Sequence, residues 1–151
     1  MRYEVALSIS SGDICWINGP FQPGAYNDLD IFRGGLKLLL EENERALGDN
    51  GYCAEDPGSC RTRNGFRVYK SETDREAAVY ISNKILARQE TVNARLKLFD
   101  CLNNYRHTYD KHQDIFTAVA VLVQINIDTD SPLFIITAKD ICDLEPERFY
   151  L

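Results

Sequence analysis

The residue with the clearest potential for chemistry is Asp49, in the segment ALGDNGY. It follows a short stretch predicted to be a strand over 45–48. In α/β folds, reactive groups gather at the carboxyl ends of strands, and the flanking Gly48 and Gly51 would let a phosphate or a metal ion approach the backbone. The alternative interpretation is that Asp-Asn-Gly forms only a turn. Local sequence by itself favours the turn.

Glu90 is the second candidate, in the segment ARQETVNARLKLF. Asn93 and Lys97 follow one and two helical turns later, so three polar groups share one side of the predicted helix. The alternative is an ordinary solvated helix face, and periodicity alone favours that interpretation.

Basic side chains near Glu90 form a locally basic region suited to the phosphates of a DNA backbone. They are Arg88, Arg95, Lys97 and Arg106. Ordinary surface charge is the alternative. The whole chain has 17 Lys and Arg against 23 Asp and Glu, a net charge of −6. This excess of acid excludes an electrostatic grip on DNA by the entire surface, so a nucleic-acid contact must rest on a local patch or on another domain.

The remaining polar residues favour structural roles. His107 and His112 are five residues apart, which does not place two imidazoles on one helix face, so a structural or phosphate-facing role is favoured over a metal pair. Asp28 and Asp30 are predicted helix caps, and Tyr52 a packing residue. Five cysteines without a CxxC pair argue against a disulfide framework and a zinc ribbon.

The elements that would position these residues can be read from apolar spacing. Alternating residues predict a strand over 3–9, with a turn at 11–13 and a return strand over 14–17. Further predicted elements are a helix from Asp28 to about 40, weakened by two glycines, a strand over 66–69, a helix from 71 or 73 to about 103, and a helix over 109–125. This order predicts an α/β fold, with three short strands in a small sheet.

A chain of 151 residues fits one domain. Its longest apolar run, AVAVLVQI, is interrupted by Gln124 and is too short for a bilayer, which requires about 20 residues. No secretory signal pattern is present at the start. We therefore expect an intracellular protein without a membrane partner or a small-molecule cofactor.

Four segments in order, INGPF, PGAYNDLDIF, ALGDNGY and ARQETVNARLKLF, resemble the DDE superfamily endonuclease domain of Harbinger-type transposases and of the nucleases derived from them. In that family a Pro-Gly-x-x-x-Asp-x-x-x-Phe segment precedes the second catalytic aspartate, which stands in an Asp-x-Gly-Tyr motif. Asp49, Gly51 and Tyr52 match that motif. A third acid lies shortly before Arg-Leu-Lys, as Glu90 does. The resemblance covers 2–134 and leaves the tail, 135–151, unassigned.

The resemblance implies a partial RNase H-like domain in which carboxylates bind Mg²⁺ or Mn²⁺. Asp49 and Glu90 would be catalytic metal ligands, and the four basic residues would hold the DNA backbone. Hard cations prefer carboxylate oxygens, and two of them can clamp the attacking and leaving oxygens of a phosphodiester. DNA is the implied partner, together with a separate DNA-binding protein, and in a eukaryote the implied location is the nucleus.

The chain departs from the family at one point. The first catalytic aspartate lies on a strand that precedes the hairpin, and neither Glu4 nor Asp13 takes its place. Three hypotheses follow. The chain is a nuclease or transposase domain whose first strand and aspartate come from another polypeptide or an upstream exon. It is a non-catalytic module that binds DNA or protein. Or it is a nonfunctional remnant of a mobile element.

Overall fold

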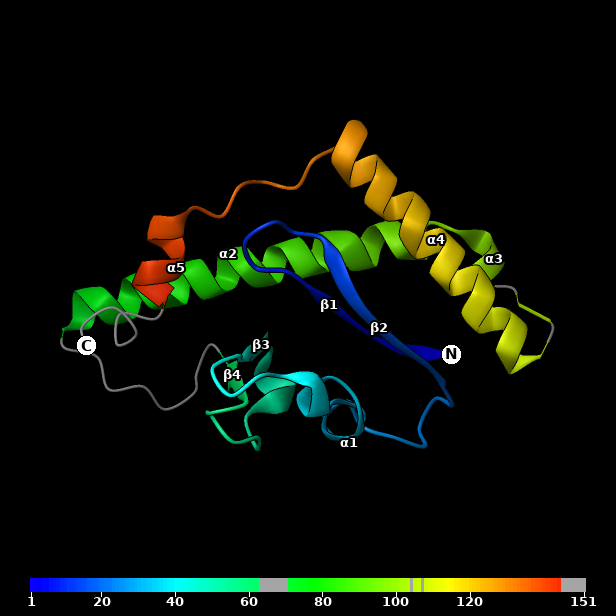
Figure 1. Ribbon diagram of the computed structural model, residues 1–151, viewed down its shortest axis with the longest axis horizontal. Helices are drawn as coiled ribbons and strands as arrows, with labels where there is room; N and C mark the ends of the chain where they lie inside the picture. The colour runs from blue at the N-terminus through cyan, green and yellow to red at the C-terminus, as the bar shows by residue number, and fades with distance from the viewer. Residues whose placement is uncertain (63–70, 104, 107, 145–151) are drawn as a thin grey trace. The chain divides into compact units, whose positions relative to one another are not determined.

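The computed structural model describes residues 1–62, 71–103, 105–106 and 108–144. The chain is a mixed α/β protein, as predicted, with long helices and short strands (Figure 1). It divides into two compact units. The first contains Met1–Asn27 and Arg88–Phe134, and the second contains Asp28–Ala87 and Ile135–Leu151. These units describe how the chain packs and do not test the family domain predicted over 2–134, which stays a prediction.

The first unit begins with the predicted hairpin. Strand β1 (Arg2–Leu7) pairs antiparallel with β2 (Ile14–Phe21), which runs four residues beyond its predicted end. Gly12 N donates to Ser8 O and Ser8 N donates to Asp13 O, both at 2.9 Å, which closes the turn between the strands. Because side chains alternate across a strand, one face is apolar. The side chains of this face that pack on the core are Tyr3, Val5, Leu7, Ile14 and Ile17.

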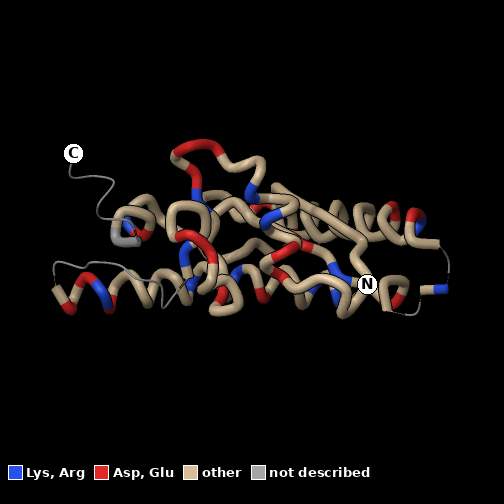
Figure 2. Tube along the Cα trace, turned by 90° about the horizontal axis from the view of Figure 1, so that it is seen from below, with Lys and Arg blue, Asp and Glu red and all other residues tan. Residues whose placement is uncertain are grey.

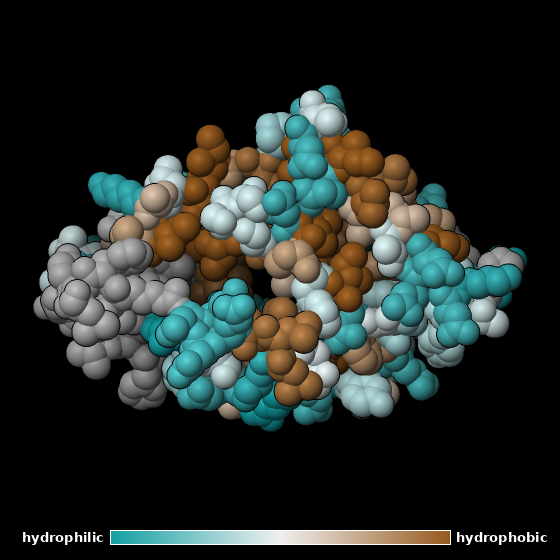
Figure 3. Space-filling model, in the orientation of Figure 1, coloured by the Kyte–Doolittle hydropathy of each residue, from teal (hydrophilic) through white to brown (hydrophobic). Residues whose placement is uncertain are grey.

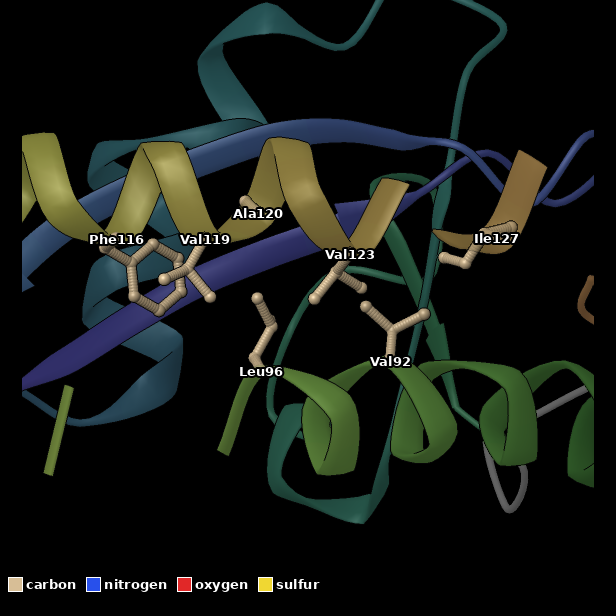
Figure 4. Close-up of a cluster of buried hydrophobic side chains, with 7 residues drawn as sticks. All are labelled: Val92, Leu96, Phe116, Val119, Ala120, Val123 and Ile127. Carbon is tan, nitrogen blue, oxygen red and sulfur yellow. The ribbon is translucent and has the colours of Figure 1, made fainter. Parts of the chain in front are cut away.

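Two helices complete the core of the first unit. The last turns of α2 (Glu72–Lys97) and the length of α4 (Tyr109–Thr129) direct apolar side chains toward one another (Figure 4). The cluster consists of Val92, Leu96, Phe116, Val119, Ala120, Val123 and Ile127. Full burial of each large aliphatic or aromatic side chain is worth about 1.5–3 kcal/mol. This cluster therefore holds the hairpin, α2 and α4 together.

The second unit starts with α1 (Asp28–Gly34), which buries Ile31 and Phe32. The predicted helix to residue 40 ends at the glycine pair and gives way to the 3-10 helix η1 (Leu36–Leu39), because glycine in a helix interior costs about 1 kcal/mol relative to alanine. Strand β3 (Ala46–Gly48) pairs in parallel with β4 (Cys60–Thr62), and η2 (Asn50–Tyr52) lies between them in sequence.

The first turns of α2 and helix α5 (Ala138–Leu144) belong to the same unit. Ser71 Oγ accepts from Asp74 N at 3.1 Å, so Ser71, the earlier of the two predicted helix starts, caps α2. At α5, Thr137 Oγ1 accepts from Asp140 N at 3.1 Å, and the Asp140 carboxylate accepts from Thr137 N at 2.7 Å. This reciprocal pair is a capping box with aspartate in the acidic position. Lys84 lies 3.2 Å from Asp140 and ties α5 to α2.

Several predicted elements differ from the structure. The helix predicted to reach residue 103 ends at Lys97 in a tight turn, and a separate short helix, α3, covers Asp100–Asn103. The prediction of one small sheet was wrong, because β3 pairs with β4 and the hairpin forms its own sheet. The strand predicted over 66–69 lies outside the described residues. No helix in the described part of the chain is long and apolar enough to cross a membrane.

Candidate functional site

Asp49 lies where the sequence predicted, directly after β3 in the second unit, and it is exposed. Its Oδ1 accepts a hydrogen bond from Gly51 N at 2.8 Å, so the side chain caps the 3-10 turn that follows. The turn interpretation of Asp-Asn-Gly is therefore correct as a description of the backbone. Only one carboxylate oxygen is used by the cap, which leaves the exposed carboxylate able to contact a ligand.

The space beside Gly48 is filled by Tyr52. A Cβ added at Gly48 would come within 2.7 Å of the Tyr52 ring and 3.1 Å of Cys60 Sγ. The same ring meets Phe32 edge to face, with centroids 5.7 Å apart. Tyr52 is thus a packing residue, as predicted. Gly48 allows this packing because it has no Cβ to clash with the Tyr52 ring.

Cys60 beneath that glycine is unsuited to nucleophilic chemistry. Burial raises the pKa of its thiol to about 11, and the carboxylates of Glu55 and Asp49 add to the shift. The thiolate is the reactive form of cysteine. At neutral pH the buried thiol therefore stays protonated.

Glu90 is exposed on the part of α2 that belongs to the first unit. Of its predicted stripe, Lys97 is exposed, whereas Asn93 Oδ1 accepts from Gln89 Nε2 at 3.4 Å. Asp49 belongs to the second unit, so the two acids do not form a site within either unit. Across the described residues, no group of three or more His, Cys, Asp or Glu side chains could hold a metal ion.

Arg88, predicted to contact DNA, is buried with 3% of its surface exposed. Its Nη1 donates to Ile9 O at 2.8 Å, and its guanidinium occupies the position that a Cβ at Gly12 would need. Burial lowers the pKa of Arg88, and the Asp13 carboxylate opposes that shift. This side chain supports the hairpin turn and does not present a cation to a phosphate.

The burial of Arg88 was readable from the sequence. At 100° per residue, Arg88 lies at one edge of the helix side marked by Ile81, Ile85, Val92 and Leu96, with Ile81 and Val92 nearest to it. All four of these residues are buried. A basic residue that borders an apolar stripe is therefore a better signal for a buried structural arginine than for a phosphate contact.

The other three predicted DNA contacts divide by exposure. Arg95 is partly buried, and its Nη1 donates to Ser131 O at 2.7 Å and to Asn126 Oδ1 at 3.2 Å. Lys97 and Arg106 are exposed. Red and blue segments are both spread along the trace, so cations and acids are interspersed along the chain (Figure 2). Lys97 and Arg106 are the members of the predicted set that remain available to a phosphate.

His112 is a buried core residue of the first unit, so of its two predicted roles, structural or phosphate-facing, the contacts favour the structural one. Its Nδ1 lies 2.7 Å from Tyr3 Oη, and its Nε2 lies 3.4 Å from Leu102 O. Tyr3 stacks on Phe116 at a centroid distance of 3.7 Å. Burial, with the neighbouring Tyr105, raises the pKa of Tyr3 to about 12. His112 therefore has a structural role, while His107 lies outside the described residues.

An ion cluster in the second unit was not predicted. Glu55 is buried in a loop and accepts from Arg33 Nε at 2.8 Å, from Lys37 Nζ at 2.7 Å and from Asp56 N at 2.9 Å. The hydrogen bond from Lys37, followed by those from Asp56 N and Arg33, lowers the pKa of Glu55 to about 2. The pairing depends on the return of the loop, and no sequence spacing signals it.

Comparisons of the chain with protein-family models, with curated proteins and with solved structures find no match. The residues and contacts described above therefore supply the argument for function.

Proposed function

We propose that this chain is a module of a DDE-type transposase or endonuclease domain and acts on DNA. The observation that supports the proposal is the ordered set of motifs, with Asp49 exposed at the carboxyl end of a strand. In this proposal the module is part of an RNase H-like domain. Asp49 in the second unit and Glu90 in the first are the acids that the resemblance assigns to catalysis, and Lys97 and Arg106 in the first unit would contact the DNA backbone.

The metal ions that the resemblance implies, Mg²⁺ or Mn²⁺, require more ligands than the described residues bring together. Asp49 and Glu90 are two carboxylates in separate units, and the described residues hold no three-membered group for a cation. The residues present thus do not fit a two-metal centre by themselves, and we derive no reaction step from such a centre. A third carboxylate, from another polypeptide or an upstream segment, would complete such a centre, and without it we expect cleavage by this chain to be slow.

A non-catalytic binding module is the second candidate. It is favoured by the same missing ligand and by the structural roles of Arg88 and Arg95, which leave fewer free cations than the sequence predicted. Such a module would hold DNA or a partner protein without cleaving a bond. A nonfunctional remnant of a mobile element would do neither.

A nicking assay tests the catalytic proposal. Supercoiled plasmid is incubated with the full chain and Mn²⁺, and open circles are measured. We expect slow nicking that is lost in Glu90→Gln and in Asp49→Asn. The second substitution preserves the fold, since asparagine caps a helical turn as well as aspartate does. The matched control is Glu76→Gln, which changes another exposed glutamate on α2.

Each outcome of the assay separates the candidates. Nicking that Glu76→Gln retains and the two site variants lose supports catalysis by this chain. Nicking that persists in Glu90→Gln indicates a contaminating nuclease and contradicts the assignment of Glu90. No nicking by the unaltered chain rejects catalysis by the chain alone and favours the binding module.

A further inference from the structure

Helix α4 has an apolar face that no described residue covers. The side opposite its buried cluster bears Ala118, Val121, Leu122 and Ile125, all exposed, and the last three have 53%, 53% and 51% of their surfaces accessible. Their spacing of three, four and seven residues forms one continuous stripe along the helix. Brown, apolar side chains gather over α4 in Figure 3. A contiguous stripe of this kind marks an interaction site more strongly than scattered exposed apolar residues do.

The charges that flank the stripe are mainly acidic. Asp110, Asp114 and Asp128 are exposed; at 100° per residue, Asp110 and Asp128 lie along one edge of the stripe, and Asp114 lies in line with it, one turn before Ala118. Lys111 is the one exposed cation of α4. Three carboxylates and one ammonium give this face a net charge of −2 at neutral pH. Acidic flanks beside an apolar stripe favour a partner with basic flanks.

A second copy of the chain fits this face poorly. If two α4 helices paired in parallel, Asp114 would lie against its counterpart. If they paired antiparallel about the middle of the stripe, Asp114 would lie against Asp128. Both arrangements bring like charges together, which is destabilising.

We propose that the α4 stripe binds an amphipathic helix of another protein, with an apolar seam and lysines or arginines beside it. Anchor residues at spacings of three, four and seven are the pattern by which helices recognise one another. The apolar seams would supply the affinity, and Asp110, Asp114 and Asp128 would set the preference for a basic partner. This binding does not depend on nuclease activity, so it goes beyond the function proposed above.

The probe is a synthetic helical peptide with leucines at the a and d positions of a heptad and lysines beside them, labelled with a fluorophore. Its comparison peptide has glutamates in place of the lysines. Fluorescence anisotropy measures the binding of both peptides to the full chain. The test variant is Val121→Gln with Leu122→Gln, and the matched control is Leu98→Gln, which changes a leucine that is 79% exposed elsewhere in the first unit.

We expect the lysine peptide to bind at least tenfold more tightly than the glutamate peptide. The double variant should weaken this binding at least tenfold, and Leu98→Gln should leave it unchanged. Circular dichroism of the double variant should match that of the unaltered chain, since both substitutions are on the surface. Absence of binding, equal binding of the two peptides, or equal binding by the double variant would overturn the proposal. So would self-association in sedimentation that the double variant abolishes, since that result assigns the stripe to a second copy.

Discussion

At the residue scale, Arg88 was predicted to contact the DNA backbone, and instead it stabilises the fold by donating to Ile9 O. Its guanidinium lies against the hairpin turn, beside a glycine with φ of +87°. Asp49 and Tyr52, by contrast, have the positions that the sequence predicted, because a strand end and an Asx turn are local features. The cluster around Glu55 was not predicted, since its partners lie 18 and 22 residues away in the sequence.

Substitution of Gly12 should measure the contact between Arg88 and the turn. Gly12→Ala introduces both a strained positive φ and a clash with the guanidinium, so we expect the free energy of unfolding to fall by about 2–4 kcal/mol. Gly24→Ala is the matched control, because Gly24 has a similar φ of +81° and open space around it. It should cost about 1 kcal/mol. Urea denaturation measures both values, and equal losses in the two variants would show that Arg88 does not restrict the turn.

The low pKa of Glu55 predicts a pH-dependent contribution to stability. A carboxylate with a folded pKa of about 2 and an ordinary value of 4.5 stabilises the fold fully above pH 4.5, and this contribution is lost as the pH falls toward 2. Glu55→Gln should lower the free energy of unfolding by about 1–2 kcal/mol at pH 7. This value is modest because Arg33 is 47% exposed and water screens the pair. The difference between variant and unaltered chain should shrink from pH 5 to pH 2 in urea denaturation, and a constant difference would exclude the ion cluster as its source.

At the element scale, the hairpin and the two long helices were predictable because periodic apolar residues marked them over many positions. Strand β4 is three residues long, too short to show a period, and its pairing with β3 is a non-local contact. The prediction of one sheet failed for this reason. Helix α5 lies in the tail that the sequence left unassigned, and its capping box at Thr137 and Asp140 was the available signal.

The packing of α2 on α4 can be tested with two nearby leucines. Leu96 is 4% exposed within the cluster of the first unit, and Leu98 is 79% exposed just beyond the end of α2. Leu96→Ala should lower the free energy of unfolding by about 2–5 kcal/mol, because it removes buried methyl groups and leaves a cavity. Leu98→Ala should change it by less than about 0.5 kcal/mol. Thermal denaturation of both variants measures the difference. A similar loss of unfolding free energy in the two variants would contradict the packing of Leu96 in the cluster between α2 and α4.

At the scale of the whole molecule, the chain consists of two compact units and has a net charge of −6. The acids proposed to face DNA belong to different units, and two of the four predicted backbone contacts are engaged within the first unit. The composition predicted that DNA contact must be local, and the exposed Lys97 and Arg106 are now the residues on which such contact depends. Whether the chain engages DNA is therefore the central question of its function.

The most direct measurement is the affinity of the full chain for a fluorescent DNA duplex between ~50 mM and ~200 mM salt. Two phosphate contacts predict a slope near −1.8 in a plot of log K against log salt, so affinity should fall about tenfold over this range. Lys97→Ala should reduce the slope by about 1, whereas Lys139→Ala, which removes an exposed lysine of α5, should not. No binding at the lower salt concentration, or a slope unchanged by Lys97→Ala, would contradict the proposal that this chain acts on DNA through the predicted contacts.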